Sequence, residues 1–222
     1  MLAWLEGSDP FPPVERALKS PNGLLAAGGE LTVARLLQAY RHGIFPWFSE
    51  GQPILWWSTD PRMVLYCEEL KVPRSLAKSV RNKGYEVRTD TAFEAVLAGC
   101  ADRPEGTWLG RPMRAAYLAL HRAGYAHSFE TWLGGDLVGG LYGVALGRMF
   151  YGESMFSRAT DASKVALVKL VETLKGRGFP LIDCQMHTEL LASLGAREVP
   201  RRIFLRELER LVNYPEQLGK WS

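Results

Sequence analysis

The second half of the sequence places short apolar segments between glycine-rich turns, in an order that few folds accommodate. Two such segments, Ala126–Leu133 and Leu137–Leu146, flank Gly134-Gly135-Asp136, a combination typical of a β-hairpin. Gly147-Arg148 predicts a second tight turn, after which Met149–Phe156 forms a third strand. The pattern therefore predicts an antiparallel meander of three strands.

A helix and a buried strand follow this meander. Asp161 is expected to cap the helix and Gly176 to end it, and its apolar face comprises Val165, Val168, Val171 and Leu174. Leu181–Gln185 has the length and composition of a short buried strand. This order resembles the acyltransferase fold of the N-acetyltransferase superfamily, and the resemblance concerns the fold alone. The predicted class is α+β, with a C-terminal N-acetyltransferase-like domain built on a mixed sheet.

The loop before the predicted helix argues against the use of acetyl-coenzyme A. Acetyltransferases of this fold hold the coenzyme pyrophosphate on a glycine-rich loop and on backbone N–H groups at a helix N-terminus. Here Ser157–Asp161 contains no glycine, and the Asp161 carboxylate would repel a pyrophosphate. We therefore expect no such cofactor.

The first half of the sequence predicts a small separate unit. Thr32 is a suitable N-cap for a helix that ends near His42. Residues 1–66 are interpreted as a small N-terminal α/β domain and residues 67–222 as the catalytic domain, with the boundary anywhere between residues 66 and 102. The other expected elements are strands at 54–57, 63–66 and 85–89 and helices at 74–82, 91–100, 112–124, 188–194 and 203–212.

An aromatic segment, Phe45–Arg62, contains three of the seven tryptophans of the chain. Proline and glycine interrupt it, so it cannot form one continuous helix or strand. Aromatic rings on such a segment can form a platform for flat or apolar ligands, including unstacked bases. They can equally plug the core of a small domain, and the composition alone does not separate these two possibilities.

Composition and charge favour a soluble chain with a local basic patch. The formal net charge is only +3, so contact with nucleic acid would depend on a cluster such as Arg74, Lys78 and Arg81, which share one helix face. That face is either a phosphate-binding stripe or an ordinary solvated surface. The three cysteines form no CxxC pair, which argues against disulfides and structural zinc. With no leader-like or membrane-spanning segment, we expect a cytoplasmic protein.

Few residues suggest chemistry. Asp183 and Gln185 are two apart on the predicted strand and should project from the same face, where they could orient an amine or form a buried polar pair. Glu153 ends a neighbouring strand and could bind a cation or form a salt bridge at the rim. Cys184 lies in an apolar strand, which disfavours a nucleophilic role.

Motifs along most of the chain resemble those of the leucyl/phenylalanyl-tRNA–protein transferase family. They are collinear from about Gly23 to Leu208, and together they are far more specific than any one alone. The matching segments are Gly23–Ala26, Tyr40–Phe48, Pro53–Ser58, Asp60–Arg62, Glu105–Trp108, Val138–Gly143, Gly152–Arg158, Ile182–Gln185 and Ser193–Ala196.

The resemblance implies an aminoacyltransferase that moves Leu or Phe, and possibly Met, from aminoacyl-tRNA to the N-terminal Arg or Lys of a protein. The product carries an N-end degradation signal. The acceptor α-amine attacks the aminoacyl ester, and because ester-to-amide exchange is downhill, no ATP, metal or other cofactor is implied. Only roughly 10–20% of a terminal amine is neutral near pH 7, so the site must handle its proton. The family also implies a monomer without membrane partners.

Site roles follow from the resemblance, residue by residue. Gln185 should accept a hydrogen bond from the amine, Asp183 should orient and polarise Gln185, and Glu153 should hold the acceptor peptide. Residues implied around the aminoacyl-adenosine are Trp47, Trp108 and Tyr40, with the aminoacyl side chain lined by Leu141, Met155, Leu167, Leu170 and Ile182. The basic face now favours contact with the tRNA backbone through Arg74, Lys78 and Arg81.

Two positions of the chain depart from the family pattern, and two other functions are also open. Leu190 stands where relatives often have His, and Leu141 stands where they can have Met, so the acceptor and the Leu/Phe/Met preferences stay open. An N-acetyltransferase would share the fold but should bind acetyl-coenzyme A. A non-catalytic RNA-binding protein would use the aromatic and basic residues but would leave Asp183 and Gln185 unexplained.

Overall fold

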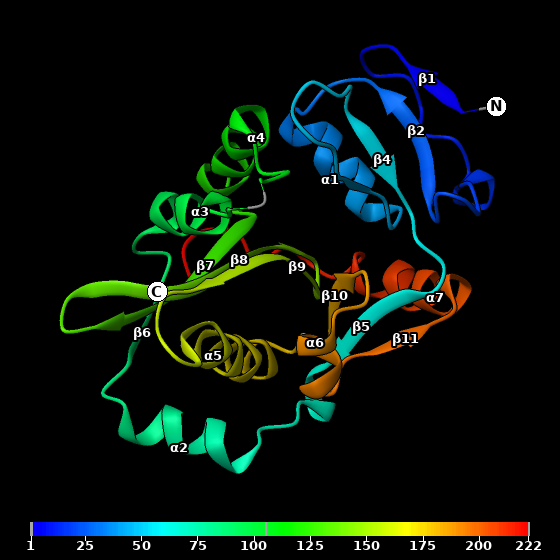
Figure 1. Ribbon diagram of the computed structural model, residues 1–222. Coiled ribbons are helices and arrows are strands. Elements are labelled where there is room, and N and C mark those ends of the chain that lie inside the picture. The colour runs from blue at the N-terminus through cyan, green and yellow to red at the C-terminus, as the bar shows by residue number, and fades with distance from the viewer. Residues whose placement is uncertain (1, 105, 222) are drawn as a thin grey trace.

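The computed structural model describes residues 2–104 and 106–221 and contains two β-sheets joined by one continuous connection between strands β4 and β5 (Figure 1). The smaller sheet has the strand order β1-β2-β4-β3, with β1 parallel and β4 antiparallel to β2. Its elements are β1 (Ala3–Leu5), the 3₁₀ helix η1 (Val14–Arg16), β2 (Leu24–Gly28), α1 (Val33–Arg41), β3 (Phe45–Pro46) and β4 (Leu55–Trp57).

Helix α1 begins and ends where the sequence predicts. The hydroxyl of Thr32 accepts a hydrogen bond from the backbone N–H of Arg35 at 3.2 Å, as an N-cap does. Gly43 follows the helix with φ of +70°, and a Cβ there would lie 2.8 Å from a methyl group of Leu205. A glycine is therefore required both by the backbone conformation and by the close approach of the C-terminal helix.

The larger sheet has seven strands in the order β11-β5-β10-β9-β8-β7-β6. Strands β7, β8 and β9 form the predicted antiparallel meander, and β10 lies parallel to β9. Their bounds are β5 (Arg62–Tyr66), β6 (Glu86–Thr89), β7 (Ala126–Leu133), β8 (Asp136–Leu146), β9 (Met149–Ser157), β10 (Leu181–Gln185) and β11 (Arg197–Val199). The helical elements are η2 (Cys67–Glu69), α2 (Arg74–Asn82), α3 (Phe93–Ala101), α4 (Arg111–Arg122), α5 (Ala162–Gly176), α6 (Glu189–Ser193) and α7 (Arg201–Leu211).

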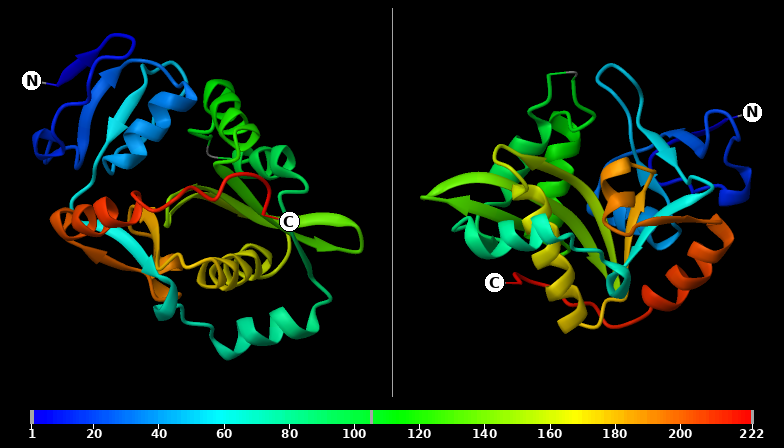
Figure 2. Two further views of the ribbon diagram at one scale, coloured as in Figure 1. Left: turned by 180° about the vertical axis from the view of Figure 1, so that it is seen from behind. Right: turned by 60° about the horizontal axis from the view of Figure 1, so that its bottom comes forward.

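The mixed sheet confirms the predicted α+β class and its N-acetyltransferase-like order of meander, crossover helix and parallel strand. Helix α5 covers one face of the sheet, whereas α3, α4 and the smaller sheet lie on the other side (Figures 1 and 2). Two apolar clusters fill these layers. One joins α1 and the smaller sheet to α3 and α4, and the other lies beneath α5.

One local expectation needs correction. Asp161 occupies the N-cap position of α5, but its φ is +65° and its side chain does not cap the helix. It accepts hydrogen bonds from Ser79 of α2 and from Lys164 instead, which ties α2 to the body of the protein. Strand β5, placed by the sequence in the N-terminal domain, pairs with β10 and β11 in the larger sheet.

None of the helices in residues 2–104 and 106–221 has the length and apolar character needed to cross a membrane.

Candidate functional site

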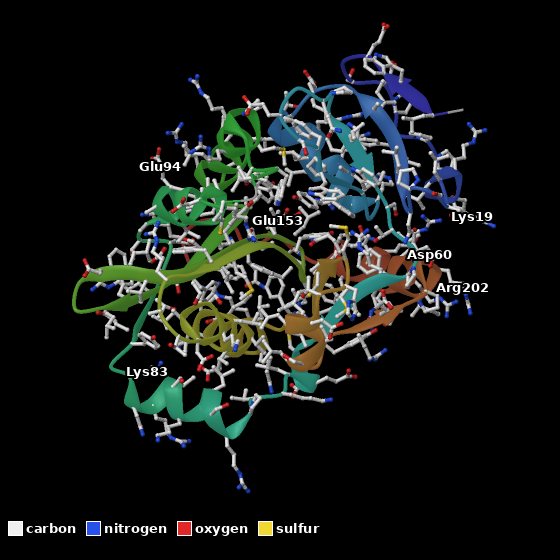
Figure 3. All side chains as sticks on the ribbon, viewed as in Figure 1. Lys19, Asp60, Lys83, Glu94, Glu153 and Arg202 are labelled. Atoms are coloured by element: carbon white, nitrogen blue, oxygen red, sulfur yellow. The ribbon has the colours of Figure 1, made fainter. Side chains whose placement is uncertain are left out.

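The carboxyl group of Glu153 lies where α1, α4 and β9 meet. The hydroxyl of Tyr40 donates to one of its oxygens at 2.7 Å, and the hydroxyl of Tyr117 donates to the other at 2.6 Å. The two hydroxyl oxygens are 3.0 Å apart. Both tyrosines are fully buried, while Glu153 itself is partly exposed. In Figure 3 the label of Glu153 lies near the centre of the molecule, between α1 and the α3–α4 pair.

The environment of Glu153 makes its proton labile near neutrality. The pKa of the carboxyl group is raised to about 7, chiefly by burial and in smaller part by the charge of Asp183, while the two tyrosine hydrogen bonds oppose the shift. Tyrosine hydroxyls donate to the carboxylate without adding a compensating positive charge. The group is therefore ready to lose its proton when a cation binds beside it.

Asp183 has a different environment, since it is completely buried against Arg62 of β5. Its oxygens accept from Nε of Arg62 at 2.8 Å and from Nη2 at 2.6 Å, which is a bidentate ion pair. Sequence analysis missed Arg62 as a site residue, although it lies in the Asp60–Arg62 motif. It missed Tyr117 as well, because nothing in a single sequence links it to Tyr40, 77 residues away.

Gln185 does not continue the regular strand of Asp183, because β10 is irregular at this point. The pairing with β5 shifts register between Asp183 and Gln185, and Gln185 has a φ of +55°. Its backbone N–H donates to Oδ1 of Asp183 at 2.9 Å, while its side-chain Nε2 donates to the Asp183 carbonyl at 3.3 Å. The carboxylate of Asp183 thus contacts the backbone N–H of Gln185, and regular strand pairing is interrupted between the two residues.

The register of β9 and β10 brings the two acidic sites to the place where these two strands stop pairing. The last parallel pair is Asp183 with Tyr151. Two residues further along the same strands are Gln185 and Glu153, beyond the last pair. A partly exposed carboxyl group and an amide therefore follow the paired part of two adjacent parallel strands, which is a suitable place for an amine nucleophile.

An open cleft of about 800 Å³ lies beside this region, between the loop 48–52 and residues 107–114. Trp108 lines the cleft and packs edge-on against Tyr117, with ring centroids 6.3 Å apart. Phe48 lines it in place of Trp47, whose ring is 37% exposed and packs against Trp57. The cleft therefore connects through Trp108 to the Tyr117–Glu153 hydrogen bond.

The residues expected to line an aminoacyl pocket gather in the apolar cluster beneath α5. Leu141, Leu167, Leu170 and Ile182 are buried there, and Met155 packs against them half-buried. Tyr40 is fully buried, so it can influence a ligand only indirectly, through neighbours such as Glu153 and Tyr117.

Helix α2 lies at the lower edge of the molecule in Figure 1, and Lys83, just beyond it, lies well apart from Glu153 in Figure 3. Arg74, Lys78 and Arg81 are all exposed, whereas Leu76 and Ser79 are buried on the opposite side of the helix. Lys83, just beyond the helix, donates to the carbonyl of Thr160 at 3.3 Å. Helix α2 is thus held at the edge of the protein with its cationic side chains directed to solvent.

Three further candidate residues lie in β10 and in the segment that follows it. Leu190 is half-buried in α6, His187 is exposed in the connection before it, and burial raises the pKa of the Cys184 thiol well above its usual range. The high pKa agrees with the expectation that Cys184 is not a nucleophile. Glu105, the first residue of one family motif, lies outside the described residues.

The fold and the carboxyl–amide site together define an acyltransferase-like protein. A family model described as the leucyl/phenylalanyl-tRNA protein transferase N-terminal domain matches residues 29–60, and one described as leucyl/phenylalanyl-tRNA protein transferase matches residues 64–209. The chain belongs to this family of transferases.

Named relatives agree over the whole chain. A leucyl/phenylalanyl-tRNA–protein transferase of Chromobacterium violaceum is 58% identical over 100% of this chain and 97% of the relative. One of Thiobacillus denitrificans is 62% identical over 96% of this chain and 94% of the relative. Among solved structures, a GCN5-related N-acetyltransferase from Kribbella flavida gives a TM-score of 0.42 at 11% identity, covering 71% of this chain and 57% of that one.

Proposed function

We propose that this chain transfers Leu or Phe, and possibly Met, from aminoacyl-tRNA to the N-terminal Arg or Lys of an acceptor protein. Family membership supports the reaction class. The observation that carries the proposal for the site is the placement of Glu153 and Gln185 beyond the last pair of β9 and β10, with the pKa of Glu153 raised to about 7. The enzyme acts as a monomer in the cytoplasm.

In the proposed reaction, the acceptor α-amine attacks the ester carbonyl of aminoacyl-tRNA. A C–N bond forms, the ester C–O bond to the tRNA ribose breaks, and the amine proton leaves as the ribose oxygen gains one. Gln185 accepts a hydrogen bond from the amine through its side-chain carbonyl, since its Nε2 is already engaged by the Asp183 carbonyl. Holding the nucleophile in this orientation is the main contribution expected of the site.

Glu153 is proposed to hold the cationic end of the acceptor. With its pKa raised to about 7, the carboxyl group is about half protonated near neutral pH in the free enzyme. A positive charge beside it favours the carboxylate, so acceptor binding and ionisation of Glu153 are coupled. An N-terminal Arg or Lys, with both an α-amine and a cationic side chain, suits this coupling better than an acidic or apolar residue.

Three further contacts complete the proposed complex. The cleft beside Trp108 and Phe48 takes the terminal adenosine, on which aromatic rings can stack. The apolar cluster around Leu141, Leu167, Leu170, Ile182 and Met155 receives the aminoacyl side chain, and exposed cations of α2 contact the tRNA backbone. Trp47, exposed beside the cleft-lining Phe48, extends the aromatic surface.

The test is transfer of labelled Leu from Leu-tRNA to a peptide with N-terminal Arg, run beside one with N-terminal Glu. Labelling of the Arg peptide alone is expected. Labelling of the Glu peptide alone would retain aminoacyl transfer and reject the basic acceptor. If folded protein with freshly charged tRNA labelled neither peptide, the RNA-binding hypothesis would replace this one.

A further inference from the structure

Gln185 is the proposed amine-binding residue, but its backbone conformation is one that non-glycine residues rarely adopt. Its φ of +55° lies in the left-handed region and coincides with the register shift of β10. A residue persists in such a conformation only where its surroundings fix it. The contacts that fix Gln185 therefore decide where its side-chain amide lies.

Both backbone groups of Gln185 are held from the connection that enters β5. The hydroxyl of Thr59 donates to the Gln185 carbonyl at 3.0 Å. On the other side, Oδ1 of Asp183 accepts from the Gln185 N–H at 2.9 Å, and the same oxygen accepts from Nε of Arg62 at 2.8 Å. Thr59 thus holds the carbonyl of Gln185 directly, and Arg62, three residues further on, holds its N–H through Asp183.

Arg62 is itself immobilised on every side. Its side chain is 1% exposed, and its guanidinium carbon lies 4.7 Å from the ring centroids of both Phe45 and Phe204. Its third donor, Nη1, reaches the carbonyl of Gly43 at 3.1 Å. The guanidinium group therefore connects the turn after α1 to the carboxylate that holds Gln185.

The same end of α1 also holds the other proposed site residue. Tyr40, three residues before Gly43, donates to Glu153 at 2.7 Å, and its backbone carbonyl accepts from the hydroxyl of Tyr151 at 2.9 Å. Two separate chains of contacts thus connect Glu153 and Gln185 to one short segment, Tyr40–Gly43.

We propose that Arg62 is a positioning residue that fixes Gln185 through Asp183 and aligns it with Glu153 by its bond to the turn after α1. This inference rests on the proposed function. It assigns Arg62 no contact with substrate: its planar, forked guanidinium is needed because it satisfies Asp183 with two donors and Gly43 with a third. Lysine cannot reproduce this arrangement with one ammonium group.

The first experiment compares Arg62→Lys with Arg35→Lys. Arg35 is a matched control, since it is also buried, lies on α1 and stacks on an aromatic ring, 3.7 Å from the centroid of Phe11. Arg62→Lys is expected to lower kcat roughly 10–100-fold, because small displacements of a positioned group cost about this much. KM for both substrates should change less than about threefold, since no substrate contact is removed. Arg35→Lys should stay close to wild type.

The second experiment is chemical rescue of Arg62→Ala by guanidinium ion at tens of millimolar. Guanidinium should restore kcat at least about tenfold, whereas ammonium at the same concentration should not, because only the planar ion matches the fork of donors. If Arg62→Ala fails to fold, Thr59→Val provides the test: it removes the second tether of Gln185, and kcat should fall with little change in melting temperature.

Three outcomes would overturn the positioning role. Arg62→Lys could match Arg35→Lys in kcat, its defect could lie wholly in KM, or guanidinium and ammonium could act alike on Arg62→Ala. Where only Thr59→Val can be measured, wild-type kcat in that variant would overturn it. Wild-type transfer to the Arg peptide is measured first, so failure of that assay rejects the proposed function and is distinct from failure of this inference.

Discussion

Asp183 and Glu153 are two acidic residues on adjacent strands of the same sheet, and they are held in opposite ways. Asp183 is fully buried and receives a bidentate contact from a cation, Arg62. Glu153 is partly exposed and receives two neutral hydroxyl groups, from Tyr40 and Tyr117. The charge of Asp183 is compensated within the protein, whereas that of Glu153 is left for a ligand to compensate. One carboxylate is therefore structural support, and the other is available to bind.

The largest effect should come from breaking the compensated pair. Asp183→Ala leaves Arg62 buried without its carboxylate and removes the acceptor for the Gln185 N–H. We expect transfer to fall by at least about 100-fold and the free energy of unfolding to fall by about 3–5 kcal/mol. Transfer kinetics and urea unfolding measure the two effects on the same samples.

The control for this variant replaces both partners. Arg62→Met combined with Asp183→Leu should regain most of the lost stability, because no unpaired charge remains buried. Transfer should stay as low as in Asp183→Ala, since Gln185 is still untethered. A double variant as active as wild type would show that the pair serves stability alone.

Ionised Asp183 stabilises the fold through its ion pair, whereas ionisation of Glu153 should lower the free energy of unfolding. The effect of Glu153 should also be the smaller one. Its pKa rises from an ordinary value of 4.5 to about 7 on folding, so the folded protein holds the proton more tightly than the unfolded chain. The stability from this group is complete below pH 4.5 and is lost as the pH rises through about 7. The difference is on the order of 3 kcal/mol at most.

Urea unfolding at pH 5, 6, 7 and 8 measures this slope in wild type and in Glu153→Gln. The glutamine variant cannot ionise, so the part of the slope that is due to Glu153 should disappear. Identical slopes in the two proteins would mean that Glu153 titrates in the folded protein as an ordinary surface acid does. The contrast with Asp183 would then lose its basis.

The same variant tests acceptor binding. Glu153→Gln should lower kcat/KM for an Arg peptide roughly tenfold, mainly through KM, because a neutral amide cannot attract the cationic terminus. In wild type, acceptor KM should fall as pH rises through about 7, where Glu153 ionises. Titration of the acceptor amine contributes to both proteins, so the quantity to compare is the ratio of wild type to variant. A ratio that does not change with pH would contradict a binding role for Glu153.

Much of the fold was predictable because its signals are local. Thr32 caps its helix as the sequence indicates, and the Gly134–Asp136 turn joins the predicted hairpin strands. The site was less predictable, because its contacts join residues far apart in sequence. Arg62 meets Asp183 across 121 positions, and Tyr117 meets Glu153 across 36. No periodicity or cap reports such pairs.

Gln185 shows a second reason why the site could not be predicted fully from the sequence. Strand alternation predicts a regular strand through both residues, but the register of β10 shifts between them and Gln185 has a positive φ. The bulge goes with tertiary contacts, here those of Thr59 and Asp183 with the backbone carbonyl and N–H of Gln185, and an ordinary strand sequence gives no sign of it. The division of the chain near residue 66 also remains a prediction, although β5 pairs within the larger sheet.

The smallest effect should come from α2, which lies outside both carboxylate sites. Arg74→Glu with Lys78→Glu should weaken binding of charged tRNA several-fold and flatten its salt dependence, because two exposed cations that can displace counterions are lost. Acceptor KM and the pH slope of stability should not change, since α2 touches neither Glu153 nor Asp183 in the described contacts. Filter binding from 50 to 200 mM salt measures the first effect, and the Ser75→Ala variant of the same helix is the neutral control. Unchanged affinity would return this face of α2 to a solvated surface, while a changed pH slope would show that the difference between the two carboxylates is not local to their contacts.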